Sequence, residues 1–133
     1  MGKASKQCIL IIEDNEGFRK SLGSQLQKHG YDVITARDGL EGLNAVRKSN
    51  PDLVITDIML PGLDGHKICR MIKFDKNFNH IPVIVLTARD LDADEETARK
   101  CGADAFVIKK TRIPIILDII QRLLERNVEV PKY

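Results

Sequence analysis

The chain has 133 residues, of which 43% are hydrophobic and 30% are charged. This length suits one domain with a full hydrophobic core that needs neither disulfides nor structural metals. The 21 Lys and Arg residues against 19 Asp and Glu residues leave a formal charge of +2, which is too small to favour direct binding to nucleic acid.

Five short apolar runs, rich in β-branched residues, recur along the chain. They span Cys8 to Ile12, Asp32 to Thr35, Leu53 to Thr56, Val83 to Leu86 and Ala105 to Ile108. Because most of these runs do not alternate between apolar and polar residues, they are typical of strands buried on both faces. A parallel sheet covered by helices on each side requires such strands.

Helical segments follow each of these strands. Apolar residues at four-residue spacing predict a first helix that stops at Gly30, and a capping box of Asp38 and Glu41 predicts the start of a second. Three further helices are predicted over His66 to Phe74, Asp92 to Cys101 and Ile113 to Glu125. Strand and helix thus alternate five times, which predicts an α/β fold with an open, doubly wound parallel sheet. Two strand orders are common for such a sheet, and the pattern alone fits both.

Polar residues stand at the carboxyl ends of four of the predicted strands. Glu13 and Asp14 follow the first, Asp57 the third, Thr87 the fourth and Lys109 the fifth. Each alone has a structural explanation as a helix cap, a strand former or a solvated lysine. Ligands of open α/β sheets bind beyond this edge, so the coincidence of all five favours a functional site.

The three carboxylates at this edge favour a divalent cation. Two carboxylates about 4–5 Å apart repel by roughly 3–4 kcal/mol at an effective dielectric constant of 20, and one Lys cannot neutralise three of them. Oxygen ligands suit Mg²⁺ with open positions for a phosphate. The scattered residues His29, His66 and His80 lack ligand spacing, which argues against zinc or copper.

Four separated motifs resemble the receiver domain of two-component response regulators. They are Leu10 to Asn15, Asp57 to Gly65, Thr87-Ala88, and Gly102 to Asp104 ahead of Lys109. The resemblance extends over residues 7–127, with tails at 1–6 and 128–133. It implies the flavodoxin-like strand order 2-1-3-4-5 with five helices, so that the first and third strands are neighbours and their acidic residues meet.

The resemblance implies a role for each acidic residue. Asp57 is implied to accept a phosphoryl group from a histidine kinase, a phosphotransfer protein or a small acyl phosphate. Asp14 and the backbone carbonyl of Met59 are implied to be Mg²⁺ ligands, with Glu13 acting through water. The protein is thus expected to be a phosphorylation-activated signalling switch. Its only expected catalysis is self-catalysed phosphotransfer and autodephosphorylation, so it is not classed as an enzyme.

The resemblance implies that the remaining residues of the edge bind the phosphoryl group or move in response to it. Thr87 and Lys109 would hold its oxygens, and Phe106 matches an aromatic switch position that moves as the Thr turns. For Phe106 a plain core position on its strand stays open as the alternative. Lys110 departs from the family, which usually has a Pro after the conserved Lys, so the Lys109–Lys110 bond is either cis or trans.

The fourth helix, fifth strand and fifth helix are the expected output surface. The segment Asp92 to Cys101 has few large apolar residues and should shift easily. Its acidic start and later basic residues, Arg122 among them, predict docking of a downstream protein or effector domain, or a homodimer, with a solvated face as the alternative. Ile115 and Ile119 are expected to project beside the core stripe of the last helix as a contact patch.

Other functions fit the residues less well. A haloacid-dehalogenase phosphatase needs a second Asp two residues after its nucleophile, where Met59 stands. No glycine-rich phosphate loop indicates a nucleotide-binding enzyme. A degenerate receiver that only binds partners is disfavoured because all five edge residues are present. The chain could be a stand-alone protein or a piece of a larger regulator.

The N-terminus and the cysteines indicate the compartment. Residues 1–6 precede only a short apolar run and do not form a signal peptide, and no stretch approaches the roughly 18 apolar residues of a membrane span. Cys8, Cys69 and Cys101 lack the spacing of zinc or redox motifs and are interpreted as reduced packing residues. We therefore expect a cytoplasmic protein without a membrane partner.

Overall fold

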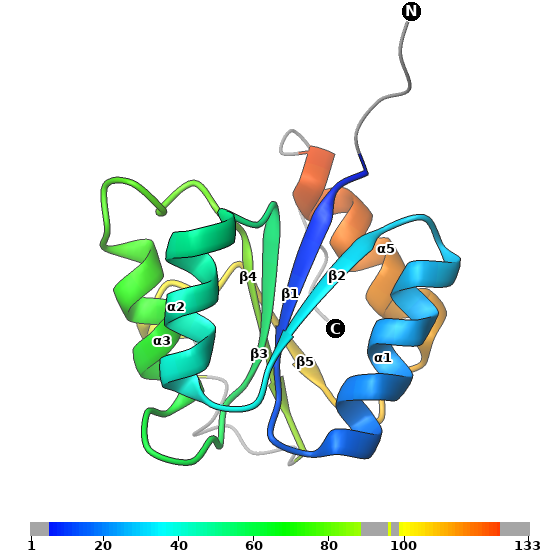
Figure 1. The fold of residues 1–133 in the computed structure, drawn as a ribbon, viewed down its shortest axis with the longest axis horizontal. Coiled ribbons are helices and arrows are strands. Elements are labelled where there is room, and N and C mark those ends of the chain that lie inside the picture. Colours follow the sequence, from blue (N-terminus) through cyan, green and yellow to red (C-terminus); the bar gives the residue numbers. More distant parts are fainter. Residues whose placement is uncertain (1–5, 89–95, 97–98, 126–133) are drawn as a thin grey trace, which may run out of the picture.

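A five-stranded parallel sheet lies between two layers of helices in the computed structural model of the chain, which describes residues 6–88, 96 and 99–125 (Figure 1). The strands are β1 (Cys8–Ile12), β2 (Asp32–Ala36), β3 (Leu53–Asp57), β4 (Val83–Thr87) and β5 (Ala105–Ile108). The helices are α1 (Glu16–Lys28), α2 (Gly39–Ser49), α3 (Gly65–Lys73) and α5 (Ile113–Glu125). The strand order β2-β1-β3-β4-β5 confirms the flavodoxin-like arrangement. The predicted helix from Asp92 to Cys101 falls largely outside the described residues.

The two layers of helices divide the core, which explains why the strands read as continuous apolar runs. Alternate strand residues such as Leu10 and Ile12 pack under α2 and α3, whereas Ile9 and Ile11 pack under α1 and α5. All four of these side chains are fully buried. Both faces of the sheet therefore stabilise the fold, as parallel strands require.

The helix ends follow the local signals of the sequence. The side chain of Asp38 accepts a hydrogen bond from the Glu41 backbone N–H at 2.8 Å and begins α2. Gly30, with a φ of 93°, follows the end of α1, and Asn50 ends α2 in the left-handed conformation. These ends leave short loops between the helices and the strands.

One prediction for the last helix is wrong. Ile119 is only 1% exposed and belongs to the core shared with Ile116 and Ile120, and Ile115 is partly buried against the same core. Residues 116, 119 and 120 share one helical face because they are three and four positions apart. The proposed contact patch of Ile115 and Ile119 therefore does not exist as an exposed surface.

Two of the three cysteines pack in the core as expected, whereas Cys8 is partly exposed. All three cysteines are free thiols, and Cys69 and Cys101 lie in the core under α2 and α3. Among the described residues, we find no helix with both the length and the apolar character needed to cross a bilayer.

Strand register aligns the polar residues at one edge of the sheet. Ile12 pairs with Thr56, so Glu13 comes next to Asp57. Thr87 pairs with Ile108, and Lys109 follows directly. The backbone N–H of Lys109 also donates to the Thr87 carbonyl at 2.7 Å. Residues that are far apart in sequence therefore meet because the strands are parallel and in register.

The start of α3 approaches the end of β3 so closely that only glycine fits. A Cβ atom on Gly65 would lie 1.8 Å from the Asp57 carbonyl oxygen, while the Gly65 N–H donates to the Ile58 carbonyl at 3.0 Å. This contact fixes the loop that covers Asp57.

We predict that Gly65→Ala lowers the free energy of unfolding by about 2–3 kcal/mol, because backbone atoms must separate to admit the methyl group. Gly17→Ala is the matched control, since its Cβ would meet only the Asn15 side chain at 3.5 Å, and it should stabilise α1 by about 0.5–1 kcal/mol. Urea denaturation of both variants checks this. Equal stability of Gly65→Ala and wild type would disprove the close contact.

Candidate functional site

The carboxyl ends of the strands form an edge with both buried and exposed acids. Glu13 is completely buried, Asp57 is 6% exposed and Thr87 is 1% exposed, whereas Asp14 is exposed. Carboxylates at such burial are rare unless they are paired. The structure thus brings together all the edge residues that the sequence singled out.

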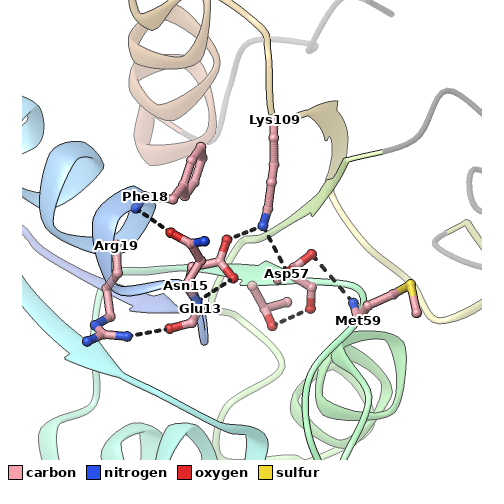
Figure 2. Close-up of polar contacts among 8 residues, drawn as sticks. Glu13, Asn15, Phe18, Arg19, Asp57, Met59 and Lys109 are labelled. Atoms are coloured by element: carbon pink, nitrogen blue, oxygen red, sulfur yellow. Dashed lines mark hydrogen bonds and ion pairs between the residues drawn. The ribbon is translucent and has the colours of Figure 1, made fainter.

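Lys109 is the cation that pairs with the buried acids. Its Nζ lies 3.0 Å from Oδ2 of Asp57 and forms a second ion pair with Oε1 of Glu13. Figure 2 shows the ammonium group between the two carboxylates. A single ammonium group thus forms ion pairs with two carboxylates.

The carboxylate oxygens of the three acids lie close enough together to bind one metal ion. Oxygens of Glu13, Asp14 and Asp57 all lie within 4.8 Å of one another. At this separation two ionised carboxylates repel by about 3–4 kcal/mol at an effective dielectric constant of 20. Lys109 cannot neutralise three charges, so the cluster retains an excess of negative charge and offers only oxygen donors.

Burial and charge shift the titration of this cluster. Burial raises the pKa of Glu13 to about 7, the ion pair with Lys109 opposes this shift, and neighbouring Asp57 adds to it. Burial by itself would lower the pKa of Lys109, but its contacts with Glu13 and Asp57 outweigh burial and raise it. Lys109 therefore stays charged at neutral pH, while Glu13 exchanges a proton near neutrality.

The loop between β1 and α1 is held by residues that the sequence analysis did not assign to the site. Asn15 caps α1 by accepting from the Phe18 N–H at 2.8 Å. Arg19, which is 9% exposed, donates from Nη1 to the Glu13 carbonyl oxygen at 2.9 Å. An Asn before a helix is a capping signal that could have revealed the role of Asn15, whereas no local pattern indicates the contact of Arg19.

Phe18 also contacts the site. Its ring centroid lies 4.9 Å from Nζ of Lys109, so the ammonium has an aromatic face on one side and carboxylates on the other (Figure 2). The four-residue spacing of Phe18, Leu22 and Leu26 indicates that Phe18 lies on the apolar face of the first helix, but helical spacing does not identify the side chain that lies over its ring.

The loop after β3 contacts the side chain of Asp57 through its backbone. The backbone N–H of Met59 lies 3.5 Å from Oδ1 of Asp57, and the hydroxyl of Thr56 donates to the Asp57 carbonyl at 3.1 Å. The Met59 side chain is 62% exposed. The backbone of this residue, rather than its side chain, is therefore turned toward the acid.

Thr87 and Phe106 are diagonal neighbours on two strands. Phe106 pairs with Val85, and Thr87, two residues further along β4, lies on the same face. Phe106 is partly buried against the core under α2 and α3. Its position is compatible with both the core and the switch interpretation.

Two features of the segment after β5 bear on the family pattern and on the predicted charged surface. The Lys109–Lys110 bond is trans, since no cis peptide bond occurs in the described part of the chain. Arg122 donates from Nε to Asp118 at 3.0 Å within α5, so within the single chain it forms a local ion pair. The acidic residues at the start of the predicted fourth helix, 92–95, lie outside the described residues.

Comparisons with known proteins agree with this geometry. The family model of the response regulator receiver domain matches residues 9–121. The chain is 36% identical over 116 residues to the polar-differentiation response regulator DivK of Brucella ovis, covering 87% of this chain and 94% of that protein. It is also 37% identical over 119 residues to the transcriptional regulatory protein AfsQ1 of Streptomyces coelicolor, covering 90% of this chain but 52% of that protein.

Solved structures show the same fold. The signal receiver domain of a signal transduction histidine kinase from Syntrophus aciditrophicus matches with a TM-score of 0.85 and 31% identity, over 96% of each chain. A CheY-like response regulator receiver domain protein from Methanospirillum hungatei matches with a TM-score of 0.85 and 25% identity, over 92% of this chain and 96% of the other.

The raised pKa of Glu13 predicts how stability changes with pH in metal-free buffer. Between pH 4.5 and about 7, the Glu13 carboxyl group keeps its proton in the folded protein but loses it in the unfolded chain, where its pKa has the ordinary value of 4.5. The free energy of unfolding should therefore fall as pH rises from about 4.5 to about 7, by up to roughly 3 kcal/mol, and then level off.

Urea denaturation across this range in wild type and Glu13→Gln measures the effect. The amide side chain in Glu13→Gln cannot ionise, so the free energy of unfolding of this variant should not show the decline that is due to Glu13. The control Glu16→Gln, at an exposed residue of α1, should show the same decline as wild type. The same pH slope in Glu13→Gln and wild type would contradict the prediction.

Proposed function

The chain belongs to the family of response regulator receiver domains, and from this premise we propose that it is a two-component signalling switch that accepts a phosphoryl group on Asp57. The observation that carries the proposal is the contact of Lys109 with both buried carboxylates beside the exposed Asp14. Such an edge prepares one carboxylate to react and surrounds it with charges that can hold a phosphoryl group.

The proposed reaction uses few protein groups. An oxygen of Asp57 bonds to phosphorus while the bond from phosphorus to a histidine nitrogen, or to the acyl oxygen of a small acyl phosphate, breaks. The bonding electrons leave with the histidine or the carboxylate. A carboxylate is a weak nucleophile, so positioning and charge neutralisation carry most of the catalysis. Lys109, whose raised pKa keeps it protonated, would hold the transferred oxygens together with Thr87.

The acidic cluster fits Mg²⁺, because its donors are all hard oxygens and it carries excess negative charge. We propose that Asp14, Asp57 and the backbone carbonyl of Met59 would hold the ion directly and Glu13 through water. A bound Mg²⁺ would supply a positive charge for the phosphoryl oxygens. The exposure of Asp14 leaves one side of the cluster open to solvent and to a phosphate donor.

Phosphorylation would change the positions of two side chains on the neighbouring strands β4 and β5. A phosphoryl group adds roughly 1.5–2 negative charges and new acceptor oxygens beside Thr87. Rotation of the Thr87 side chain toward them would free space for Phe106, its diagonal neighbour on β5. Phe106 lacks the hydroxyl of a Tyr, so an outward position would depend on packing alone.

The partners and compartment follow from this proposal. A sensor histidine kinase or phosphotransfer protein would supply the phosphoryl group, and a downstream protein or effector domain would bind the surface around β5 and α5. A homodimer through the same surface remains part of the proposal, without the patch of Ile115 and Ile119. The domain would span residues 7–127 and act in the cytoplasm as a phospho-acceptor rather than as an enzyme with turnover.

Incubation with acetyl phosphate tests the proposed phosphorylation. We expect intact mass spectrometry to record one added phosphoryl group in the presence of Mg²⁺, and at least about tenfold less after chelation with EDTA, because the remaining charges cannot hold the phosphoryl oxygens. Asp57→Asn should remain folded and unmodified.

Two results would contradict this function. Equal labelling of Asp57→Asn and wild type would remove Asp57 as the acceptor, and continuous release of phosphate without a labelled protein would indicate a phosphatase. Asp52→Asn serves as the matched control, since Asp52 lies at the opposite end of β3 and accepts a hydrogen bond from the Cys8 backbone.

A further inference from the structure

A hollow lies between two helices, away from the acidic edge. α2 and α3 cover one face of the sheet side by side (Figure 1), and the hollow between them measures about 230 Å³. Its floor consists of Leu43, Val46 and Ile72, all of which belong to the core beneath these helices. The hollow thus reaches from the surface down to buried core residues.

Large apolar side chains form the wall of the hollow and remain in solvent. Phe74, at the end of α3, is 71% exposed, and Met71, one turn earlier, is 45% exposed. Single exposed apolar residues are ordinary, but these two adjoin an apolar hollow and enlarge it into a continuous patch. The guanidinium of Arg70 lies 5.5 Å from the Phe74 ring centroid, a contact that leaves most of the ring exposed.

Basic residues predominate among the charged residues of α2, α3 and the turn that follows. Arg47 lines the hollow, and the guanidinium of Arg70 lies over the Phe74 ring. The exposed basic residues of these elements are Arg47, Lys48, Lys67, Arg70 and Lys76. None of them forms an ion pair with another residue in the described ranges. Asp75 is the single acidic residue among those lining the hollow, and its Oδ1 accepts the backbone N–H of Asn77 at 2.8 Å.

The apolar hollow and the basic residues indicate which kind of partner would bind this surface. An apolar hollow between two helices receives side chains of a third helix, and unpaired basic residues at its border attract acidic ones. We propose that the α2–α3 surface, defined by the hollow, Phe74, Met71 and the five basic residues, binds an acidic amphipathic helix of a partner protein. The apolar face of that helix would cover Phe74 and fill the hollow, and its Asp and Glu residues would pair with the basic border.

This binding goes beyond the proposed phosphorylation and does not depend on it. None of the residues that line the hollow belongs to the acidic edge of Glu13, Asp14, Asp57 and Lys109. Asp57→Asn protein should bind the same helix as wild type. Failure of phosphorylation would therefore leave this inference intact, and failure of binding would leave the phosphorylation intact.

A designed peptide provides the probe. It has about 18 residues, with Leu at positions i, i+3, i+4 and i+7 and Glu at the flanking positions, and its counterpart carries Lys in place of Glu. Fluorescence anisotropy of the labelled peptides measures affinity, and amide chemical shifts of the isotope-labelled full chain locate the site. We expect the acidic peptide to bind at least about tenfold more tightly than the Lys peptide and to shift amides of α2 and α3.

Matched variants separate the apolar and the charged contributions. Phe74→Ala should weaken binding at least about fivefold, whereas Leu40→Ala, which removes a 67% exposed side chain of α2 outside the hollow, should change it less than about twofold. Arg47→Gln, in the last turn of α2, should weaken binding, and Lys28→Gln, in the last turn of α1 on the other face, should not. Circular dichroism checks that each variant is folded.

Several outcomes would overturn the inference. They are absence of binding to wild type, equal binding of the acidic and Lys peptides, equal affinity of Phe74→Ala and wild type, or amide shifts confined to α1 and α5. Binding of wild type, but not of Phe74→Ala, to vesicles with anionic lipid in place of the peptide would assign the surface to a membrane. Self-association lost in Phe74→Ala would assign it to a second copy of the chain.

Discussion

Two buried carboxylates share one ammonium group at the end of a parallel sheet, and the rest of the site is arranged around this shortage of positive charge. Glu13 and Asp57 are almost inaccessible to solvent, and Lys109 contacts both. Removing a carboxylate from water costs several kcal/mol unless partners replace the water, so the site tolerates these charges only in this geometry. The excess negative charge makes the edge receptive to a cation, and in the proposed reaction that cation would offset the negative charge that a phosphoryl group adds at Asp57.

The surrounding fold holds this arrangement through backbone contacts rather than through additional charges. Arg19 donates to the Glu13 carbonyl, Gly65 lets α3 start against the Asp57 carbonyl, and β4 and β5 are in a register that sets Lys109 beside Thr87. Parallel strands are essential here, because they bring five segments to the same edge with their carboxyl ends together. A phosphoryl group at Asp57 would thus act on groups that are already rigidly placed, and Thr87 and Phe106 are the proposed points of movement.

Two surfaces of the molecule differ in what they offer to other proteins. The proposed switch residues Thr87 and Phe106 lie on β4 and β5 and do not line the hollow, although Phe106 packs against the same core. The α2–α3 surface carries an apolar hollow with basic residues around it. A receiver domain with two such surfaces could be recognised at one of them whatever its phosphorylation state. The exposed Phe74 ring, supported by Arg70, is the feature that distinguishes this second surface from a merely solvated helix face.

Much of this arrangement could be predicted from the sequence because the signals are local. Apolar runs located all five strands to within one residue at their ends, and the order of acidic, hydroxyl and lysine residues identified the edge. The burial of Ile119 was missed because apolar residues occupy most positions of α5, so the limits of its buried face are hard to define from the pattern. The contacts of Phe18 with Lys109 and of Arg19 with Glu13 were missed because they depend on where a loop places one turn of helix against another strand. The hollow under Phe74 depends on the separation of two helices, which no local pattern encodes.

Identification of the residue that carries the phosphoryl group is the sharpest test of the proposed reaction at Asp57. After treatment with acetyl phosphate and Mg²⁺, borohydride reduces an acyl phosphate to an alcohol, and peptide mass mapping then identifies the reduced side chain. We expect reduction at Asp57 alone, because only this acid is both in contact with Lys109 and next to the proposed phosphate-binding groups. Reduction at Asp14 or Glu13, or a modified His in place of an acid, would contradict it.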